Sequence, residues 1–156
     1  MKTCECVLTG HSNWVLSICT SDDGCLAASG SGDKTIIIWD ISNRNKKLNL
    51  IGHENAVAGV TFSRCSKFVI SVSYDKSVRV WDVKTGIQKY ILLTHTAIFW
   101  SICITKNDKY AILSSDDCEV HIWDWKNKQK IAILSGFSPI KEEIMQNPEL
   151  RQLLDE

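Results

Sequence analysis

The chain has 156 residues, and its 18 basic and 18 acidic side chains leave the formal net charge at zero. Proteins that hold a phosphate backbone usually carry a basic excess, so this balance argues against nucleic-acid binding. No apolar run approaches the roughly 18–20 residues that a membrane span requires, and the first residues lack the apolar segment of a secretory signal. We therefore expect an intracellular protein, cytoplasmic or nuclear, that binds neither nucleic acid nor membrane.

The seven cysteines predict a reduced chain without a metal or another cofactor. Their odd number argues against an exported disulfide scaffold. Cys4 and Cys6 could begin a metal site, but no second ligand pair follows at a suitable spacing. Several of the other cysteines fall at apolar positions of expected strands, where cysteine behaves as a small hydrophobic residue.

In chain order, the sequence predicts a leading strand over residues 3–9 and then three rounds of four strands. The first round covers 15–20, 26–31, 35–39 and 47–51, the second 57–62, 68–73, 77–81 and 88–93, and the third 99–104, 110–115, 119–123 and 128–134. Apolar and polar side chains alternate in strands such as 77–81, which is typical of half-buried strands. Polar turns rich in Gly, Asp and Asn separate the strands because these residues tolerate turn conformations.

Three tryptophans recur at an interval of 42 residues, and each is followed by an aspartate. The same interval relates a histidine, a serine and a second aspartate in every round. The complete sets are His11, Ser31, Asp33 and Trp39; His53, Ser73, Asp75 and Trp81; and His95, Ser115, Asp117 and Trp123. A period of about 40–45 residues with Gly-His at one end and Trp-Asp at the other is typical of propeller blades.

These residues resemble the WD40-repeat β-propeller family. The resemblance is carried by the Gly-His and Ser-x-Asp motifs and by the tripeptides Ile38-Trp39-Asp40, Val80-Trp81-Asp82 and Ile122-Trp123-Asp124. It implies an all-β fold, a partial propeller of three four-stranded antiparallel blades at about 11–51, 53–93 and 95–134. These blades and the leading strand make up a repeat domain over 1–136.

The resemblance also implies a role for the repeated polar residues, which would form a hydrogen-bonded relay within each blade. The physical reason is general, because a buried imidazole, hydroxyl, carboxylate and indole N–H are costly unless each finds a partner. Arranged in a chain, the four groups satisfy one another and fix the strand geometry.

A serine, a histidine and an aspartate could also form the catalytic triad of a hydrolase. A triad is needed once per site, and its nucleophile must face a cleft. Here the set occurs three times, each time with a tryptophan, so we expect a scaffold and not an enzyme. His121 lies next to Ile122 on the third strand of the third round, and we expect it to be an exposed histidine on a blade face.

The resemblance implies that a partner docks on the face where the Gly-His and Ser-x-Asp turns emerge. The three copies differ there, and large aromatic side chains occupy several of the variable positions. Aromatic residues dominate interface hot spots. The candidate contacts for a partner protein or peptide are Trp14, Leu16, Tyr74, Ile98, Trp100 and Asp116. The alternative for Trp14 and Trp100 is that they pack between blades.

Three blades are fewer than the roughly four to eight with which radial propellers close. An open arc exposes apolar faces and strand edges at both ends, which favours association. The chain could form a homodimer of about six blades, pair with another propeller fragment, or be a piece of a longer propeller.

The pattern changes after the last blade, and residues 137–156 predict a short helical tail. Ser138-Pro139 and Asn147-Pro148 each place a capping residue before a proline at a first helical position. The tail either packs over the open end of the last blade or offers an amphipathic helix to a partner groove.

Overall fold

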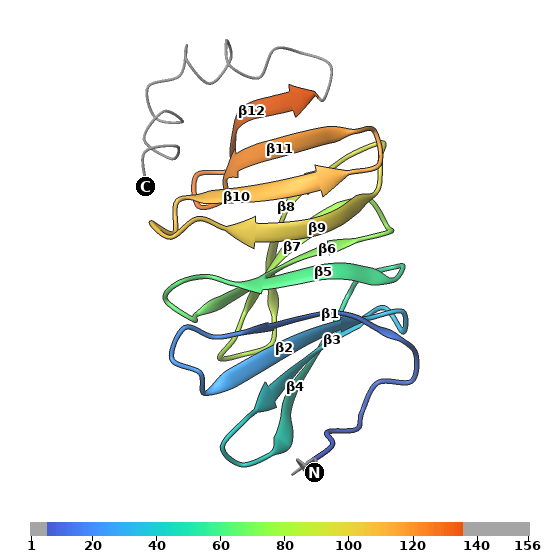
Figure 1. Ribbon diagram of the computed structural model, residues 1–156, viewed down its shortest axis with the longest axis vertical. Coiled ribbons are helices and arrows are strands. Elements are labelled where there is room, and N and C mark those ends of the chain that lie inside the picture. Colours follow the sequence, from blue (N-terminus) through green and yellow to red (C-terminus); the bar gives the residue numbers. More distant parts are fainter. Residues whose placement is uncertain (1–5, 136–156) are drawn as a thin grey trace, which may run out of the picture.

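The computed structural model describes residues 6–135, and the regular secondary structure in that part consists entirely of β-strands. The strands form three four-stranded antiparallel sheets, which we call blades 1, 2 and 3 in chain order (Figure 1). Blade 1 consists of β1 (Val15–Thr20), β2 (Leu26–Ser31), β3 (Thr35–Asp40) and β4 (Asn45–Ile51). Blade 2 consists of β5 (Val57–Phe62), β6 (Phe68–Ser73), β7 (Ser77–Asp82) and β8 (Gln88–Thr94). Blade 3 consists of β9 (Phe99–Ile104), β10 (Tyr110–Ser115), β11 (Glu119–Asp124) and β12 (Gln129–Ser135).

The tight turn between the second and third strands has the same conformation in all three blades. Lys34, Lys76 and Cys118 occupy it with φ values of 71°, 67° and 66°. In blades 1 and 2 the residue just before is an aspartate, whose carboxylate accepts the amide hydrogen two residues further on, at 3.0 and 2.9 Å. Aspartate favours turns because it bonds its own backbone in this way. The Ser-x-Asp motif therefore marks this turn.

The twelve expected strands agree with the observed ones to within two residues, but the expected leading strand is wrong for its described part. Residues 6–9 form no strand and are exposed. A strand needs a partner edge, and the outer position of blade 3 is already occupied by β12. The expected helical tail lies outside the described residues. Among residues 6–135, no helix has the length and apolar character that a membrane crossing requires.

Apolar side chains form the core between neighbouring blades. The inner strands β1, β5 and β9 lie side by side in Figure 1, so that each blade packs one face against the next. The cluster between blades 1 and 2 consists of Ala28, Ile36, Ile38, Leu50, Val57, Val60, Phe62, Val69, Trp81 and Val83. An equivalent cluster between blades 2 and 3 includes Val72, Val80, Phe99, Leu113 and Trp125. Within the described part of the chain, blade 2 is thereby covered on both faces, whereas blades 1 and 3 are each covered on one.

The uncovered face of blade 1 is apolar. Val15 is 54 % exposed and Ile18 is 70 % exposed, whereas their equivalents in blade 2, Val57 and Val60, are 0 % and 4 % exposed. At the other end of the array, Val120 on β11 is also exposed. Both ends therefore present the kind of surface that blade 2 buries.

Arg64, in the turn between β5 and β6, connects blade 2 to both of its neighbours. Its Nη1 donates a hydrogen bond to Asp22 Oδ1 of blade 1 at 3.1 Å, and its Nη2 donates to the Ile104 carbonyl of blade 3 at 3.3 Å. Its backbone N–H donates to Asp108 Oδ1, also in blade 3, at 2.8 Å. These bonds lie at the end of the strands opposite the Ser-x-Asp turns.

Candidate functional site

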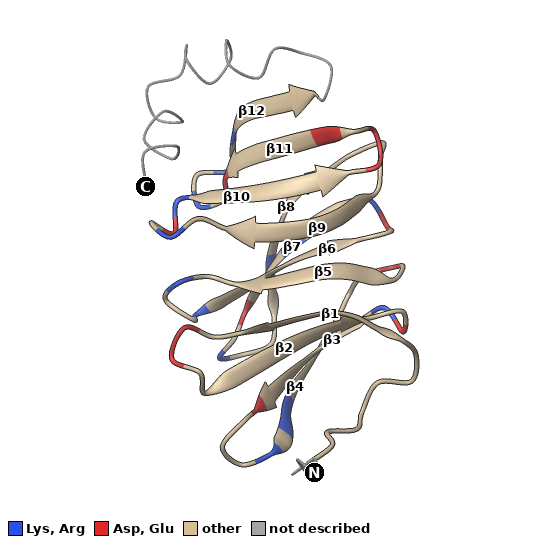
Figure 2. Cartoon of the chain, viewed as in Figure 1, with Lys and Arg blue, Asp and Glu red and all other residues tan. Residues whose placement is uncertain are grey.

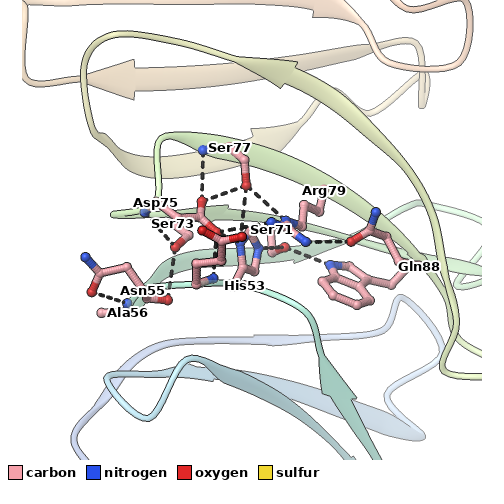
Figure 3. A network of polar contacts seen from close by, with 11 residues as sticks. His53, Asn55, Ala56, Ser71, Ser73, Asp75, Ser77, Arg79 and Gln88 are labelled. Atoms are coloured by element: carbon pink, nitrogen blue, oxygen red, sulfur yellow. Dashed lines mark hydrogen bonds and ion pairs between the residues drawn. The ribbon is translucent and has the colours of Figure 1, made fainter.

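Blade 2 contains a continuous hydrogen-bonded relay that runs from its tryptophan to its aspartate (Figure 3). The Trp81 indole N–H donates to Ser71 Oγ at 2.8 Å, and the Ser71 hydroxyl donates to His53 Nε2 at 2.7 Å. The Nδ1–H of His53 then donates to Asp75 Oδ2 at 2.7 Å. Because these residues come from β6, β7 and the segments next to them, the relay holds the strands of the blade in register.

Asp75 ends the relay as an ionised carboxylate beside a neutral imidazole. Its Oδ1 accepts the Ser77 hydroxyl at 2.6 Å, and its Oδ2 accepts the Glu54 amide hydrogen at 3.0 Å. Burial raises the pKa of Asp75, but hydrogen bonds from His53, Ser77 and the Glu54 amide together lower it well below its usual range. Burial and, to a lesser degree, the charge of Arg79 lower the pKa of His53, and together they outweigh the rise that Asp75 causes. Every member of the relay is satisfied in this state.

Blade 1 has the same relay. Trp39 Nε1 donates to Ser29 Oγ at 2.8 Å, Ser29 donates to His11 Nε2 at 2.7 Å, and His11 Nδ1 donates to Asp33 Oδ2 at 2.8 Å. Hydrogen bonds from Thr35, the amide of Ser12 and His11 lower the pKa of Asp33 far below its usual range, although burial raises it. The relay is therefore a repeated structural unit.

The serines of these relays are Ser29 and Ser71, so the predicted relay serines Ser31 and Ser73 are wrong. Residues two apart on a strand share a face, but they lie about 7 Å apart along it, beyond the reach of the indole N–H. Ser31 Oγ instead donates to the Asn13 carbonyl and accepts the amide hydrogen two residues on, both at 3.1 Å, and Ser73 makes the same two bonds. The sequence does contain an indication of the correct serines, because Ser29 and Ser71 are also separated by 42 residues.

The predicted relay of blade 3 does not form. Leu113 occupies the position of the relay serine, and Trp123 Nε1 is buried without a hydrogen-bond partner among the described residues. His95 Nδ1 lies 3.6 Å from Asp117 Oδ2, which is too long for a hydrogen bond. Ser115 donates its hydroxyl to Asp117 Oδ1. Blade 3 therefore keeps the histidine, the tryptophan and the turn aspartate, but not the hydrogen bonds that join them in the other blades.

Two further side chains of blade 3, Glu119 and His121, also differ from their counterparts in blades 1 and 2. His121 was expected to be exposed, but only 1 % of it is accessible, so that expectation is wrong. Its ring packs edge-to-face on Phe99 and His95, with centroid distances of 5.4 and 4.9 Å. His95, Asp117, Glu119 and His121 each offer one ligand atom, and these atoms all lie within 4.8 Å of one another. Blade 3 thus has a cluster of imidazoles and carboxylates where the other blades have a relay.

The predicted partner contacts of blades 1 and 2 line one cleft. Trp14, Leu16 and Tyr74 surround a space of about 430 Å³ at the end of the blades where the Ser-x-Asp turns lie. The lining is completed by Asn13, Gly32 and Ala56. Trp14 is 81 % exposed, so the alternative that it packs between blades is wrong.

Trp100 continues this row of aromatic side chains into blade 3. The Tyr74 and Trp100 rings meet edge-to-face, with centroids 5.2 Å apart and an angle of 73° between their planes. Trp100 is about half exposed, so it contacts its neighbour and still faces solvent. Of the remaining candidates, the Asp116 carboxylate accepts the backbone N–H of the half-buried Ile98 at 2.9 Å. The candidates thus follow one edge across all three blades.

Comparison with known proteins agrees with this geometry. The family described as WD domain, G-beta repeat (WD40) matches residues 2–40, 44–82 and 86–124. A 44-residue segment is 46 % identical to pre-mRNA-splicing factor PRP46 of Yarrowia lipolytica and covers 28 % of this chain and 10 % of that protein. A 35-residue segment is 54 % identical to nuclear distribution protein PAC1 of Candida albicans and covers 22 % of this chain and 7 % of that protein.

A third relative is nuclear distribution protein nudF 2 of Aspergillus clavatus, which is 43 % identical over 49 residues, or 31 % of this chain and 11 % of that protein. The matched segments therefore span about a tenth, or less, of the length of these three relatives. The family match, in contrast, extends over three successive repeats and most of the chain. Together with the three four-stranded blades and the relays of blades 1 and 2, it shows that this chain belongs to the WD40-repeat family.

Proposed function

We propose that the chain is a non-catalytic scaffold that binds a partner protein or peptide on its aromatic face. We define the aromatic face by the six candidate contacts Trp14, Leu16, Tyr74, Ile98, Trp100 and Asp116. Membership of the WD40 family supports a role in protein interaction in general. Two relatives are named as a splicing factor and a nuclear distribution protein, which supports a place inside the cell, in the nucleus or the cytoplasm.

The observation that carries this proposal is the exposure of Trp14 beside the cleft that it shares with Tyr74. Large aromatic side chains are enriched at interface hot spots because one ring buries much apolar area at a low cost in conformational entropy. The edge-to-face contact between Tyr74 and Trp100 holds both rings in place at one end of the blades. A partner would therefore meet a largely preformed surface.

The burial of the relay supports the absence of catalysis. Ser71 has no exposed surface, and its hydroxyl is engaged with both His53 and Trp81. A nucleophile of a Ser-His-Asp triad must face a cleft that admits substrate. The serine, histidine and aspartate of blade 2 are better explained as an internal support for the aromatic face.

A peptide selection with the full chain tests the proposal. Peptides selected by phage display on the immobilised wild-type chain would be measured against Trp14→Ala and Tyr74→Ala, and each variant should weaken binding at least about tenfold, as is common for hot-spot aromatics. Ile87→Ala is the matched control, because Ile87 is a similarly exposed apolar residue between β7 and β8. If the two aromatic variants bind as the wild type does while Ile87→Ala weakens binding, the aromatic face is not the binding surface.

A second candidate function is to complete a longer or oligomeric propeller. It is favoured by the exposure of Val15 and Ile18, whose equivalents Val57 and Val60 are buried against blade 1. We propose that the free face of blade 3 can pack on the free face of blade 1 of another copy in the way that blade 1 packs on blade 2. A head-to-tail contact of this kind either closes a ring or continues as a filament.

The solution mass tests this second candidate. Light scattering over a dilution series should give a mass near twice 17.6 kDa if two arcs close into one ring. Ile18→Lys should return the mass to that of one chain, whereas Ile87→Lys, with the same change at a remote exposed position, should not. A single-chain mass at every concentration of the wild-type protein would contradict self-association.

A further inference from the structure

Three positions of blade 3 differ from the corresponding positions of blades 1 and 2 in a coordinated way. Leu113 replaces the relay serine, Glu119 replaces the hydroxyl residue that donates to the turn aspartate, and His121 replaces an isoleucine or an arginine. The changes remove two hydroxyl groups and add one carboxylate and one imidazole, both close to Asp117. The loss of the relay in blade 3 is therefore accompanied by the gain of a different polar cluster.

The spacing of this cluster suits metal coordination better than hydrogen bonding. His95 Nδ1 lies 3.6 Å from Asp117 Oδ2 and accepts the Ala97 amide hydrogen at 3.1 Å, a bond that an ion at this atom would replace. His121 Nε2 lies 3.5 Å from Glu119 Oε2. The distances of 3.6 and 3.5 Å exceed the usual range for hydrogen bonds. They are close to the roughly 3.3 Å that separates two ligand atoms on a tetrahedral zinc ion with bonds of about 2.0–2.1 Å. All four ligand atoms lie within 4.8 Å of one another, so modest shifts of the side chains would bring them to the spacing of ligands on one ion.

His121 is the member of the cluster that most requires a partner. Its Nε2 is buried and has no hydrogen-bond partner among the described residues. A buried polar atom without a partner is costly, and such atoms are rare in folded proteins. In blade 2 the same position holds Arg79, whose guanidinium Nη2 lies 3.5 Å from Asp75 Oδ2. Blade 3 therefore lacks the cation that stands next to the turn aspartate in blade 2.

The surroundings of the cluster also fit. Phe99 is fully buried and packs against the rings of both His95 and His121, which provides an apolar shell on one side. The other side is open, since the side chains of His95, Asp117 and Glu119 are about three-tenths accessible to solvent. Figure 2 shows acidic residues at the start of β11 and in the turn that leads into it. An ion therefore has a route into the cluster from solvent.

We propose that His95, Asp117, Glu119 and His121 form a binding site for a divalent transition metal of the zinc class, which replaces the hydrogen-bonded relay as the polar support of blade 3. Two imidazoles and two carboxylates are donors that zinc accepts, and two carboxylates balance the charge of a divalent ion. This site is independent of the aromatic face, and neither proposal requires the other.

The test is a titration of the full chain, stripped with a chelator, with Zn²⁺ by calorimetry and with Co²⁺ by absorption spectroscopy. The wild-type protein should bind one ion, show the visible bands of four-coordinate Co²⁺ without a thiolate charge-transfer band, and melt at a higher temperature with metal than without. His121→Ile, which introduces the residue of blade 1, should weaken binding more than about 100-fold, because even changes to outer partners of metal ligands cost roughly 10–100-fold.

Glu119→Thr provides a second variant at an accessible position, where a folding defect is not expected, and it should weaken binding in the same way. Its matched control is Glu54→Thr, the same change at an exposed glutamate of blade 2, which should bind as the wild type does. The proposal is overturned if the wild-type chain binds neither ion, if both cluster variants bind as tightly as the control, or if a thiolate band shows that cysteines hold the metal.

Discussion

Trp81 and Trp123 occupy the same place in neighbouring blades, but among residues 6–135 only the Trp81 indole N–H finds an acceptor, the hydroxyl of Ser71 at 2.8 Å. The acceptor is missing in blade 3 because Leu113 stands where a serine is found in the other two blades. Two side chains with the same identity and the same place in the fold thus make different contributions to stability.

Replacing the two tryptophans with phenylalanine should reveal this difference. We expect Trp81→Phe to lower the free energy of unfolding by about 1–2 kcal/mol more than Trp123→Phe, because only the first change removes a hydrogen bond while the second removes an unsatisfied donor. Urea denaturation of both variants measures the difference. Equal losses would mean that the Trp123 N–H has an acceptor in solution.

The histidines of blades 2 and 3 should differ in the same sense. His53→Ala should cost about 2–4 kcal/mol, because it leaves Asp75 and Ser71 without their partner inside the blade. His95→Ala should cost less in metal-free protein, since its imidazole makes neither of the two relay bonds. Thermal melting in the presence of a chelator checks the order, and a larger loss for His95→Ala would contradict it.

The free energy of unfolding should decrease as the pH falls below about 6.5, which is the usual pKa of an exposed histidine. The pKa values of His53 and His121 are lowered in the folded chain, so the unfolded chain takes up protons first and is favoured as the pH falls towards the folded-state values. A second loss of stability should begin below about pH 3.9, the usual pKa of an aspartate. The pKa values of Asp33 and Asp75 are lower in the folded chain, so the unfolded chain takes up protons first and is favoured as the pH falls further.

Urea denaturation at a series of pH values, in the presence of a chelator, measures this profile. His53→Gln should reduce the slope between pH 7 and 5, because it removes one of the two histidines whose pKa is lowered by folding. Stability that stays constant over this range in the wild-type chain would show that neither histidine is held neutral.

Gly30 should not tolerate a larger side chain. A Cβ atom at this position would lie 2.7 Å from Val57 Cγ1 and 3.1 Å from the Val57 carbonyl oxygen, across the junction of blades 1 and 2. We expect Gly30→Ala to cost about 1–3 kcal/mol, as overpacking usually does. Gly32→Ala is the control, because its Cβ meets only the exposed Asn13 side chain. Equal effects in thermal melting would show that the blades move apart easily.

Much of the fold could be predicted because the features that form it recur at a constant interval. Trp39, Trp81 and Trp123 marked the third strands, where apolar and polar residues alternate, and polar turns marked the ends of the other strands. The prediction over residues 6–9 was wrong because strand propensity does not supply a partner edge. The outer position of blade 3, which such a strand would take, is already filled by β12.

The candidate site was predicted less well, and the reason is specific. Ser31, Ser73 and Ser115 keep the interval through all three copies, whereas the serines that make the relays are replaced by Leu113 in the third. The repeat pattern therefore predicts the serines that recur in every copy as the relay serines, although they stabilise a turn and it is the other serines that bond to the histidines. His121 was misjudged because the equivalent position holds Arg79, and the burial of that position depends on packing that sequence alone does not show.

The bonds of Arg64 have a consequence for how the array comes apart. In a row of repeats, the end units usually unfold on their own, since each contacts only its neighbours. Here a single guanidinium holds Asp22 of blade 1 and the Ile104 carbonyl of blade 3, so opening of either end removes a partner from the same side chain. Because the Arg64 and Asp22 side chains are both more than two-fifths exposed, these bonds couple the end blades only weakly, by about 1 kcal/mol or less. The amide protons of the end blades should therefore still exchange with solvent faster than those of blade 2.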